Sequence, residues 1–418
     1  MDLEYTARRR GLTVLLIDAF LMYGGFFMLV PLISVYYVRD LGFAAASIGL
    51  VLAARQLTQQ GLTLFGGALA DRWGAKGLIC WGMAIRTLSF AGLAWANTFT
   101  ILLVLCILAA MGGALFDAPK QAAIAALTEP AQRARFFSLS SIAGGLGMTI
   151  GPLVGSLLLE TDFALVCFVS AICFAVAGVV TLLWLPTVRV ALGQQPAGHG
   201  IMLAARNQPF VLFTLLLCGY WFMWVQLSIS LSLAAQRWGV PLLPTPWGDF
   251  NINGVAWIYG LNAGLTVVLQ YPVLRLAERW LRSMPIVVVG TVLMALGLGF
   301  VAFTGSLATL LICVALFSVG AMLVQPTQQT VTAELADPSA LGSYFGASAL
   351  ALALGGGLGN FLGGWLYDAS ERWHTPTLPW LIFCGIGLSV AVGLLLLDRM
   401  LTRTQHRPAT AVRSTPLS

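Results

Sequence analysis

The sequence predicts an all-α membrane protein whose twelve transmembrane helices form two pseudo-symmetric six-helix bundles. Apolar residues make up 59% of its 418 residues and charged residues only 9%, whereas soluble domains carry about 25% charged residues. The mean hydropathy is +0.88. So few charges cannot cover the surface of a soluble fold. The composition therefore excludes a soluble enzyme, a disordered protein and a nucleic-acid-binding protein.

The predicted helices are apolar stretches separated by charged or Pro/Gly-rich breaks. A helix needs about 20 mostly apolar residues to cross the hydrocarbon core of a bilayer. The first stretch is too long for a cleaved signal segment and contains Asp18, so we keep it as a helix. Twelve stretches qualify: 12–38, 44–70, 77–96, 99–120, 136–158, 163–185, 209–236, 254–276, 284–304, 307–330, 343–366 and 378–398.

The distribution of Lys and Arg predicts the orientation of these helices. If the N terminus is cytoplasmic, most loop and tail cations lie in the cytoplasm, and only Arg39, Arg237 and Arg372 lie on the opposite side. The positive-inside rule therefore places both the N and the C terminus in the cytoplasm. The net charge of +6 reflects this topology and gives no indication of nucleic-acid binding.

An internal repeat divides the chain into two halves. Leu69–Trp73 recurs as Leu276–Trp280, and a glycine triplet at positions 147, 151 and 155 recurs 208 residues later. Duplicated halves suit a transporter that opens alternately to each side of the membrane. We predict an N-terminal six-helix bundle over 1–185, a cytoplasmic linker over 186–208, a C-terminal six-helix bundle over 209–398 and a basic cytoplasmic tail over 399–418.

A charged loop follows the second predicted helix and returns in the repeat. It resembles the signature loop of the major facilitator superfamily, in which Gly, Asp, Arg, Gly and a basic pair recur. Ala75 stands where the family usually has the first basic residue. The resemblance implies a gate at the cytoplasmic face, and a positively charged turn without a gating role is the alternative. The loop contains Gly67, Asp71, Arg72, Gly74 and Lys76, and its repeat contains Glu278 and Arg279.

The fifth predicted helix carries Gly147, Gly151, Pro152 and Gly155. Glycine at every fourth position gives a smooth helix face, and proline removes a backbone hydrogen bond. The segment resembles the helix-5 motif of the drug:proton antiporter branch of the superfamily, whose last glycine is Ser156 here. In that branch the motif accompanies export. Close helix packing without a transport role is the alternative.

Three charged residues lie deep within predicted helices: Asp18, Arg55 and Arg86. Charges in the membrane interior are costly and are usually functional. Proton loss from Asp18 would strengthen its attraction to either arginine, which predicts a proton-coupling site. A static ion pair is the alternative. For Asp117 and Lys120 we expect an ion pair that closes the fourth helix at the cytoplasmic boundary, in preference to a coupling role.

The C-terminal half has no charge at depth but has aromatic and amide side chains. We expect an aromatic, weakly polar substrate cavity that suits amphipathic aromatic or cationic compounds through stacking and cation–π contacts. The alternative is that these side chains contact lipid or neighbouring helices. The predicted cavity residues are Phe26, Tyr220, Trp221, Trp224 and Asn262.

The resemblance to the drug:proton antiporter branch covers essentially the whole chain. It implies a monomeric proton-coupled secondary transporter of the bacterial inner membrane that exports hydrophobic or amphipathic drug-like compounds, with protons and membrane lipid as its other partners. Leu108 and Met111 stand where the branch often has Arg and Gln. Arg55 or Arg86 would then have to supply the basic group.

Two other functions remain possible on this pattern. One is proton-coupled import or export of a small metabolite, such as a sugar or peptide, on the same fold. The other is a non-transporting membrane sensor, which leaves the duplicated loops unexplained. We expect neither enzyme activity, nor a cofactor, nor a metal site, because the sequence shows no catalytic set and no phosphate-binding loop. The cysteines lie in apolar helices, and we place His199, His374 and His406 in loops or tail.

Overall fold

The computed structural model describes residues 2–187, 197–236, 240–241, 251–252, 254–337 and 341–405. Helices dominate this part of the chain, and its two antiparallel strands, β1 (Val240–Pro241) and β2 (Asn251–Ile252), have two residues each. Short helical turns are η1 (Tyr36–Asp40), η2 (Leu93–Trp95), η3 (Val225–Leu227), η4 (Val301–Phe303) and η5 (Leu352–Gly356). The α-helices are α1 (Asp2–Val35), α2 (Ala45–Trp73), α3 (Ala75–Gly92), α4 (Phe99–Leu127), α5 (Pro130–Leu159), α6 (Phe163–Trp184), α7 (Ala197–Arg206), α8 (Gln208–Trp224), α9 (Ser230–Ala235), α10 (Gly254–Trp280), α11 (Ser283–Phe300), α12 (Leu307–Leu335), α13 (Leu341–Ala351), α14 (Gly357–Arg372) and α15 (Leu378–Gln405).

Ten helical segments of the described residues are long and apolar enough to cross a membrane. This confirms an all-helical membrane architecture. The predicted stretches 44–70 and 254–276 form α2 and α10 but are not among the ten. These helices have 29 and 27 residues, a length of about 40 Å at 1.5 Å per residue. They are long enough to span a bilayer but are more polar than the ten candidate spans. The count of twelve membrane-crossing helices therefore stays a prediction.

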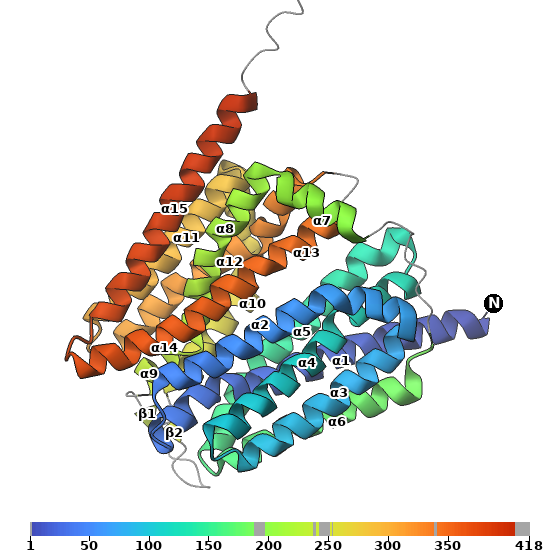
Figure 1. Ribbon diagram of the computed structural model, residues 1–418, viewed down its shortest axis with the longest axis horizontal. Helices are drawn as coiled ribbons and strands as arrows, with labels where there is room; N and C mark the ends of the chain where they lie inside the picture. Colours follow the sequence, from blue (N-terminus) through green and yellow to red (C-terminus); the bar gives the residue numbers. More distant parts are fainter. Residues whose placement is uncertain are drawn as a thin grey trace, which may run out of the picture.

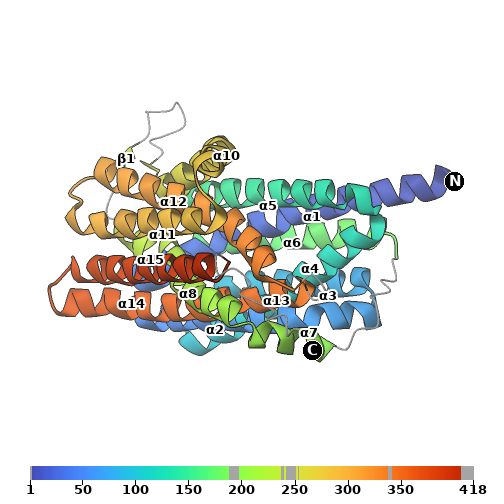
Figure 2. The same ribbon diagram turned by 90° about the horizontal axis from the view of Figure 1, so that it is seen from above.

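The helices gather in two groups, shown from blue to green and from green to red in Figure 1. In the first group, α1 packs on α5 and α6, and α3 packs on α4 and α6. Figure 2 shows α1 and α5 running side by side. In the second group, α11 packs on α12 and α15, and α8 packs on α15. The two groups meet where α2 packs on α14 and where α5 packs on α10.

The sequence repeat corresponds to a repeated helix contact. A Cβ atom added at Gly82 in α3 would collide with the carbonyl oxygen of Gly112 in α4, and the reverse also holds. The same reciprocal contact joins Gly290 in α11 to Gly320 in α12, 208 residues further on. Only glycine allows two helix backbones to approach so closely. The duplication is therefore visible in the packing of both halves.

The glycine triplets also occupy equivalent places. The triplet of α5 lies against the backbone of α1, and the triplet of η5 and α14 lies against α8 and η3. Added Cβ atoms at Gly147, Gly151 and Gly155 would meet backbone atoms of Phe20, Gly24 and Met28, while those at Gly355, Gly359 and Gly363 would meet Cys218, Phe222 and Gln226.

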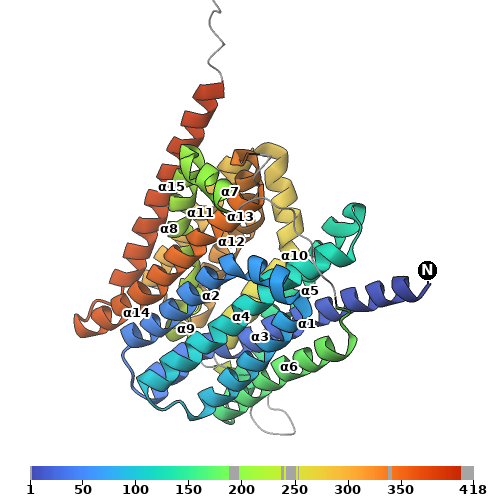
Figure 3. The ribbon, with the colours of Figure 1, turned by 45° about the vertical axis from the view of Figure 1, so that its right-hand side comes forward.

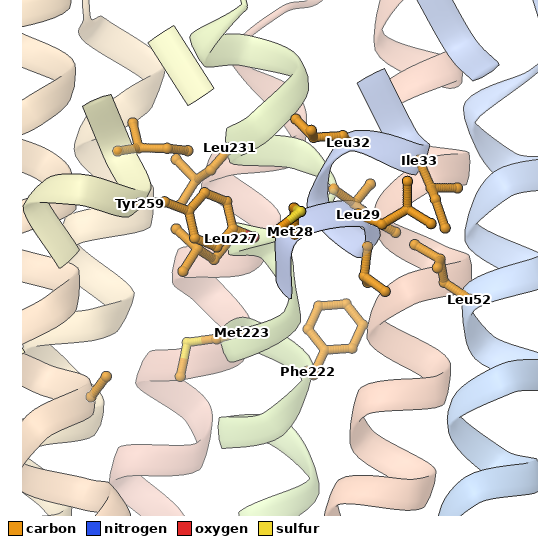
Figure 4. Packing of buried hydrophobic residues seen from close by; sticks show 14 of the residues in the cluster. Met28, Leu29, Leu32, Ile33, Leu52, Phe222, Met223, Leu227, Leu231 and Tyr259 are labelled. Carbon is orange, nitrogen blue, oxygen red and sulfur yellow. The ribbon is translucent and has the colours of Figure 1, made fainter. Parts of the chain in front are cut away.

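The two groups touch at one end, where η1, the start of α2, α9 and the last turns of α14 meet; we call this the closed end. Figure 3 shows the groups diverging from there toward the start of α1 and the last turns of α15. Beside the closed end, apolar side chains from α1 and α2 face others from α8, η3, α9 and α10 (Figure 4). They include Met28, Leu29, Leu32, Leu52, Leu227, Leu231 and Tyr259.

Candidate functional site

Asp18 is fully buried where α1 packs against α6. Its Oδ2 atom accepts a hydrogen bond of 2.6 Å from the Thr181 hydroxyl, and its Oδ1 atom has no hydrogen-bond partner. Among the described residues, no ion pair joins Asp18 to Arg55 or Arg86. The structure therefore does not form the cluster of one acid and two bases that we expected. A carboxyl group with a single donor costs much less to bury as the neutral acid than as the ion.

Arg55 in α2 and Arg86 in α3 instead share the ring of Phe26 in α1. Their guanidinium carbons lie 4.9 and 5.1 Å from its centroid, and the Arg86 carbon lies 5.5 Å from the centroid of Phe174. The arginines are only 7% and 4% exposed. Arg86 Nε donates to the carbonyl of Ala109. The negative ring faces thus compensate part of the buried positive charge.

The Gln59 side chain connects Arg55 to Asp117. Arg55 donates to Gln59 Oε1 at 3.0 Å and to Gln56 Oε1 at 2.9 Å, while its Nε atom has no partner. Gln59 Nε2 donates in turn to Asp117 at 3.3 Å, and the Tyr23 hydroxyl donates to the same carboxylate at 3.2 Å. The half-buried carboxylate of Asp117 is thus held by two donors from two helices.

We expected Lys120 to close the fourth helix, but α4 continues through Pro119 to Leu127. Lys120 is only 6% exposed. Its ammonium nitrogen lies 5.2 Å from the ring centroid of Tyr23 and 5.0 Å from that of Phe116. Within the described structure, no direct ion pair joins it to Asp117. Proline lacks an N–H, but packing by neighbouring helices lets a membrane helix tolerate it.

Apart from Gly74, the predicted gating residues lie in helices. The helix α2 runs through Trp73, and the chain turns at Gly74, whose φ of +80° suits glycine. Lys76 is half-buried in the first turn of α3. Glu278 and Arg279 are exposed in the last turn of α10. The side chains of Asp71 and Arg72, and the surroundings of Gly67, lie outside the described residues.

The helix-5 motif lies between α1 and α10. Its glycines face α1, and Leu153, next to Pro152, would contact a Cβ atom added at Gly260 in α10. Pro152 lies inside a continuous helix. The motif therefore lies where α5 of one group of helices meets α10 of the other.

The predicted cavity residues divide into two sets. Phe26 belongs to the arginine pair described above. On α8, the ring of Trp221 makes edge contacts with Tyr220 at 5.1 Å and with Trp224 at 5.4 Å. Tyr220 is fully buried in this conformation, whereas the two tryptophans are half-buried. Asn262 in α10 accepts a hydrogen bond of 2.8 Å from Ser318.

Two pockets lie away from these residues. One, of about 350 Å³, lies at the closed end and is lined by residues that include Ala234, Tyr367 and Trp380. The other, of about 310 Å³, lies beside α7 and includes Asn207 and Tyr344. Helix α7 contains His199, so our placement of this histidine in a loop is wrong.

Sequence reasoning did not assign roles to Tyr23, Gln59 or Thr181. Gln59 follows Arg55 by four residues, which places both on one helix face, and this spacing was a usable signal. Thr181 lies 163 residues from Asp18, and nothing in its own segment points to an acid.

We expect Phe26→Leu to destabilise the protein by about 2–4 kcal/mol, since it removes ring contacts to two buried guanidinium groups. The measurement is the thermal unfolding temperature of the detergent-solubilised protein. Phe27→Leu is the control, because Phe27 makes an edge contact with Phe26 at 5.1 Å but, among the described residues, no cation–π contact. Equal destabilisation by both variants would show that the guanidinium contacts contribute nothing specific.

Comparison with known proteins gives the family. The chain matches the Major Facilitator Superfamily over residues 15–246 and again over 227–417. It is 40% identical to "Multidrug resistance protein MdtH" of Photorhabdus laumondii subsp. laumondii, over 93% of this chain and 94% of that protein. The proteins of the same name from Yersinia enterocolitica and Proteus mirabilis are 40% and 39% identical, over 94% and 98% of this chain and 96% and 99% of theirs.

Solved structures show the same fold at low sequence identity. A POT family transporter in complex with a thioalcohol conjugated peptide has a TM-score of 0.78 at 14% identity, covering 94% of this chain and 97% of the other. The nucleoside transporter NupG has a TM-score of 0.75 at 14% identity, covering 94% and 99%. The family and these relatives indicate a multi-pass membrane transporter rather than an enzyme. The chain belongs to the Major Facilitator Superfamily.

Proposed function

We propose that the chain is a proton-coupled secondary transporter of the bacterial inner membrane that exports hydrophobic or amphipathic drug-like compounds by alternating access. The multidrug resistance names of relatives at about 40% identity support export of such compounds. The observation that carries proton coupling is Asp18, a fully buried carboxyl group with one hydrogen-bond donor.

Burial links the protonation of Asp18 to the conformation of the protein. In the described conformation its surroundings favour the neutral acid, because a buried carboxylate ion would lose its bound water and gain only one hydrogen bond, from the Thr181 hydroxyl. A conformation that opens the contact between α1 and α6 to water would favour the ion. A proton taken up on one side of the membrane and released on the other would then shift the equilibrium between the two conformations.

Arg55 and Arg86 would influence Asp18 through α1 without touching it. Phe26 follows Asp18 by eight residues on α1, which is about two helical turns. One face of α1 thus holds the acid against α6, and another holds the ring against the two guanidinium groups. A shift of α1 would disturb both contacts together.

The remaining parts of the proposal follow from the repeat and the charge distribution. Both termini would be cytoplasmic, and the bundles over 1–185 and 209–398 would move against one another as a monomer. Asp71 and Arg72 would latch the cytoplasmic face, and the helix-5 motif at Gly151 and Pro152 would act as the pivot, since α5 contacts α10 of the other group.

Compound-driven proton movement in proteoliposomes tests the proposal. Lipophilic cations and aromatic antibiotics are added under an imposed pH gradient, and a trapped pH-sensitive dye reports the flux. We expect several compounds to move protons with the protein and none with empty liposomes. Flux driven by a sugar, peptide or nucleoside alone would favour the metabolite carrier. If no compound drives proton flux, the result would favour a non-transporting membrane sensor.

We expect the double variant Trp221→Ala with Trp224→Ala to lower the transport rate at low substrate concentration about 30-fold, because each ring contributes about 1 kcal/mol of stacking or cation–π contact. The initial rate across substrate concentrations is the measurement. Trp95→Ala is the control, since this ring lies in η2, just after α3, and is 66% exposed. An unchanged rate in the double variant would remove both tryptophans from the substrate site.

A further inference from the structure

At the closed end, a carboxylate from α14 holds the first turn of α2. The Ala45 N–H donates to Asp368 Oδ1 at 2.9 Å, and the Ala46 N–H donates to Asp368 Oδ2 at 2.7 Å. The two partners belong to different helix groups and are 323 and 322 residues apart. Each carboxylate oxygen therefore takes one N–H group at the positive end of a helix of the other half.

The first turn of α2 has no cap of its own. The first N–H groups of a helix lack partners within it, and Ser, Thr, Asp or Asn just before the helix normally supplies one. Thr98, Asp162 and Ser306 do this for α4, α6 and α12. The residues around the start of α2 are Phe43-Ala44-Ala45-Ala46, which have no side-chain acceptor. The capping group comes instead from the opposite half.

Arg39 makes a second polar contact between the halves at the same end. Its Nη2 atom donates to the Tyr367 hydroxyl at 2.9 Å and to the carbonyl of Leu233 at 3.1 Å. Tyr367 precedes Asp368 in α14, and Leu233 lies in α9. Arg39 of the N-terminal half and Asp368 of the C-terminal half therefore each bind polar groups of the opposite half.

The backbones of α2 and α14 are also in close contact here. A Cβ atom added at Gly364 would collide with the carbonyl oxygen of Ala45, and one added at Gly49 would collide with that of Asn360. At these glycines no side chain separates the backbones of α2 and α14. The hydrogen bonds of Asp368 lie at one end of this close helix contact. Separating the halves at this end must break all of these contacts.

We propose that Asp368 and Arg39 form a latch that keeps the closed end shut and so sets the equilibrium between the two access states. The proposal rests on the alternating-access part of the proposed function and is independent of the substrate and of proton coupling. When the end opens, the N–H groups of Ala45 and Ala46 lose a charged acceptor and Arg39 loses two acceptors. Charge-assisted hydrogen bonds of this kind are about twice as strong as neutral ones.

The test is the distance between spin labels at the closed end, measured by double electron–electron resonance. The labels are placed at Asn97 and Thr375, exposed residues of opposite halves, in a variant whose seven native cysteines are replaced by alanine. We expect Asp368→Ala to raise the ratio of the long-distance to the short-distance population about tenfold. Arg39→Gln is expected to act in the same direction.

Asp162→Ala is the matched control. Asp162 accepts from the Ala164 N–H at 3.0 Å and so caps α6 within its own half. We expect its loss to leave the distance distribution unchanged. A distribution in Asp368→Ala that matches the wild type would overturn the latch, and so would equal opening in Asp162→Ala.

A second measurement covers the case in which Asp368→Ala does not fold. Asp368→Asn keeps one acceptor oxygen, and we expect it to open the end to a smaller extent and to speed hydrogen exchange of the peptide over residues 41–50. Unchanged exchange and unchanged distances in this variant would overturn the proposal. The measurements use neither substrate nor pH gradient, so a failure of compound-driven flux would leave their outcome intact.

Discussion

Replacing Asp18 with Asn is expected to abolish compound-driven proton movement, with a loss of at least about 100-fold in the proteoliposome assay. An asparagine has the same shape, and its oxygen can still accept the Thr181 hydrogen bond, but its amide group cannot take up or release a proton. Exchange of labelled compound across the membrane without a pH gradient should persist, because no net proton transfer is needed for it. The pair of measurements separates coupling from folding.

Two variants define the specificity of this result. Thr181→Val removes the single donor to Asp18 and should alter the pH dependence of flux without abolishing it. Asp117→Asn changes a half-buried acid that two donors hold, and should retain coupling. If Asp18→Asn retains compound-driven proton movement while Asp117→Asn loses it, the proton carrier is Asp117 and our assignment is wrong.

Gly155→Val is expected to leave little folded protein in the membrane. A Cβ atom at this position collides with the carbonyl oxygen of Met28, so α1 and α5 must move apart along a contact that includes Gly147 and Gly151. Overpacking of this kind costs about 1–3 kcal/mol for a small group and more for a branched one. For the milder Gly155→Ala variant, we expect the unfolding temperature in detergent to fall by about 5 °C.

Gly145→Ala provides the control on the same helix, since a Cβ added there would have no atom of a neighbouring helix within 4 Å. Alanine favours a helix over glycine by about 1 kcal/mol, so this variant should be as stable as the wild type or slightly more stable. Alanine brings the same gain in helix propensity at residue 155. Our prediction therefore requires that the collision there cost more than this gain. A Gly155→Ala variant as stable as Gly145→Ala would show that α1 and α5 can separate without cost.

The fold could be predicted because the solvent is lipid. Continuous apolar stretches directly indicate helices that cross a membrane. The glycine triplets and the repeated loop indicated a duplication, and equivalent close contacts occur in both halves, at Gly82 with Gly112 and at Gly290 with Gly320. The helices α2 and α10 show the limit of this reasoning. Both form, but their polar residues bring their apolarity below that of the ten candidate spans.

The site was predicted less well. Counting residues along a helix gives the depth of a side chain in the membrane, but it does not show which neighbouring helix the side chain faces. Asp18, Arg55 and Arg86 are all buried, but the rotation of α1 turns Asp18 toward α6 and Phe26 toward the arginines. Pro119 suggested a helix end, although packing keeps α4 intact beyond it. Contacts between residues more than 100 positions apart, such as Asp18 with Thr181, leave no local signal.

The capping of α2 by Asp368 has a consequence for biosynthesis. The first turn of α2 leaves the ribosome 323 residues before its capping carboxylate is made. An N-terminal half that inserts first must therefore keep the N–H groups of Ala45 and Ala46 in contact with water or lipid headgroups until α14 arrives. Completion of this helix is one of the last events in assembly, and a chain truncated after α6 would retain a frayed first turn.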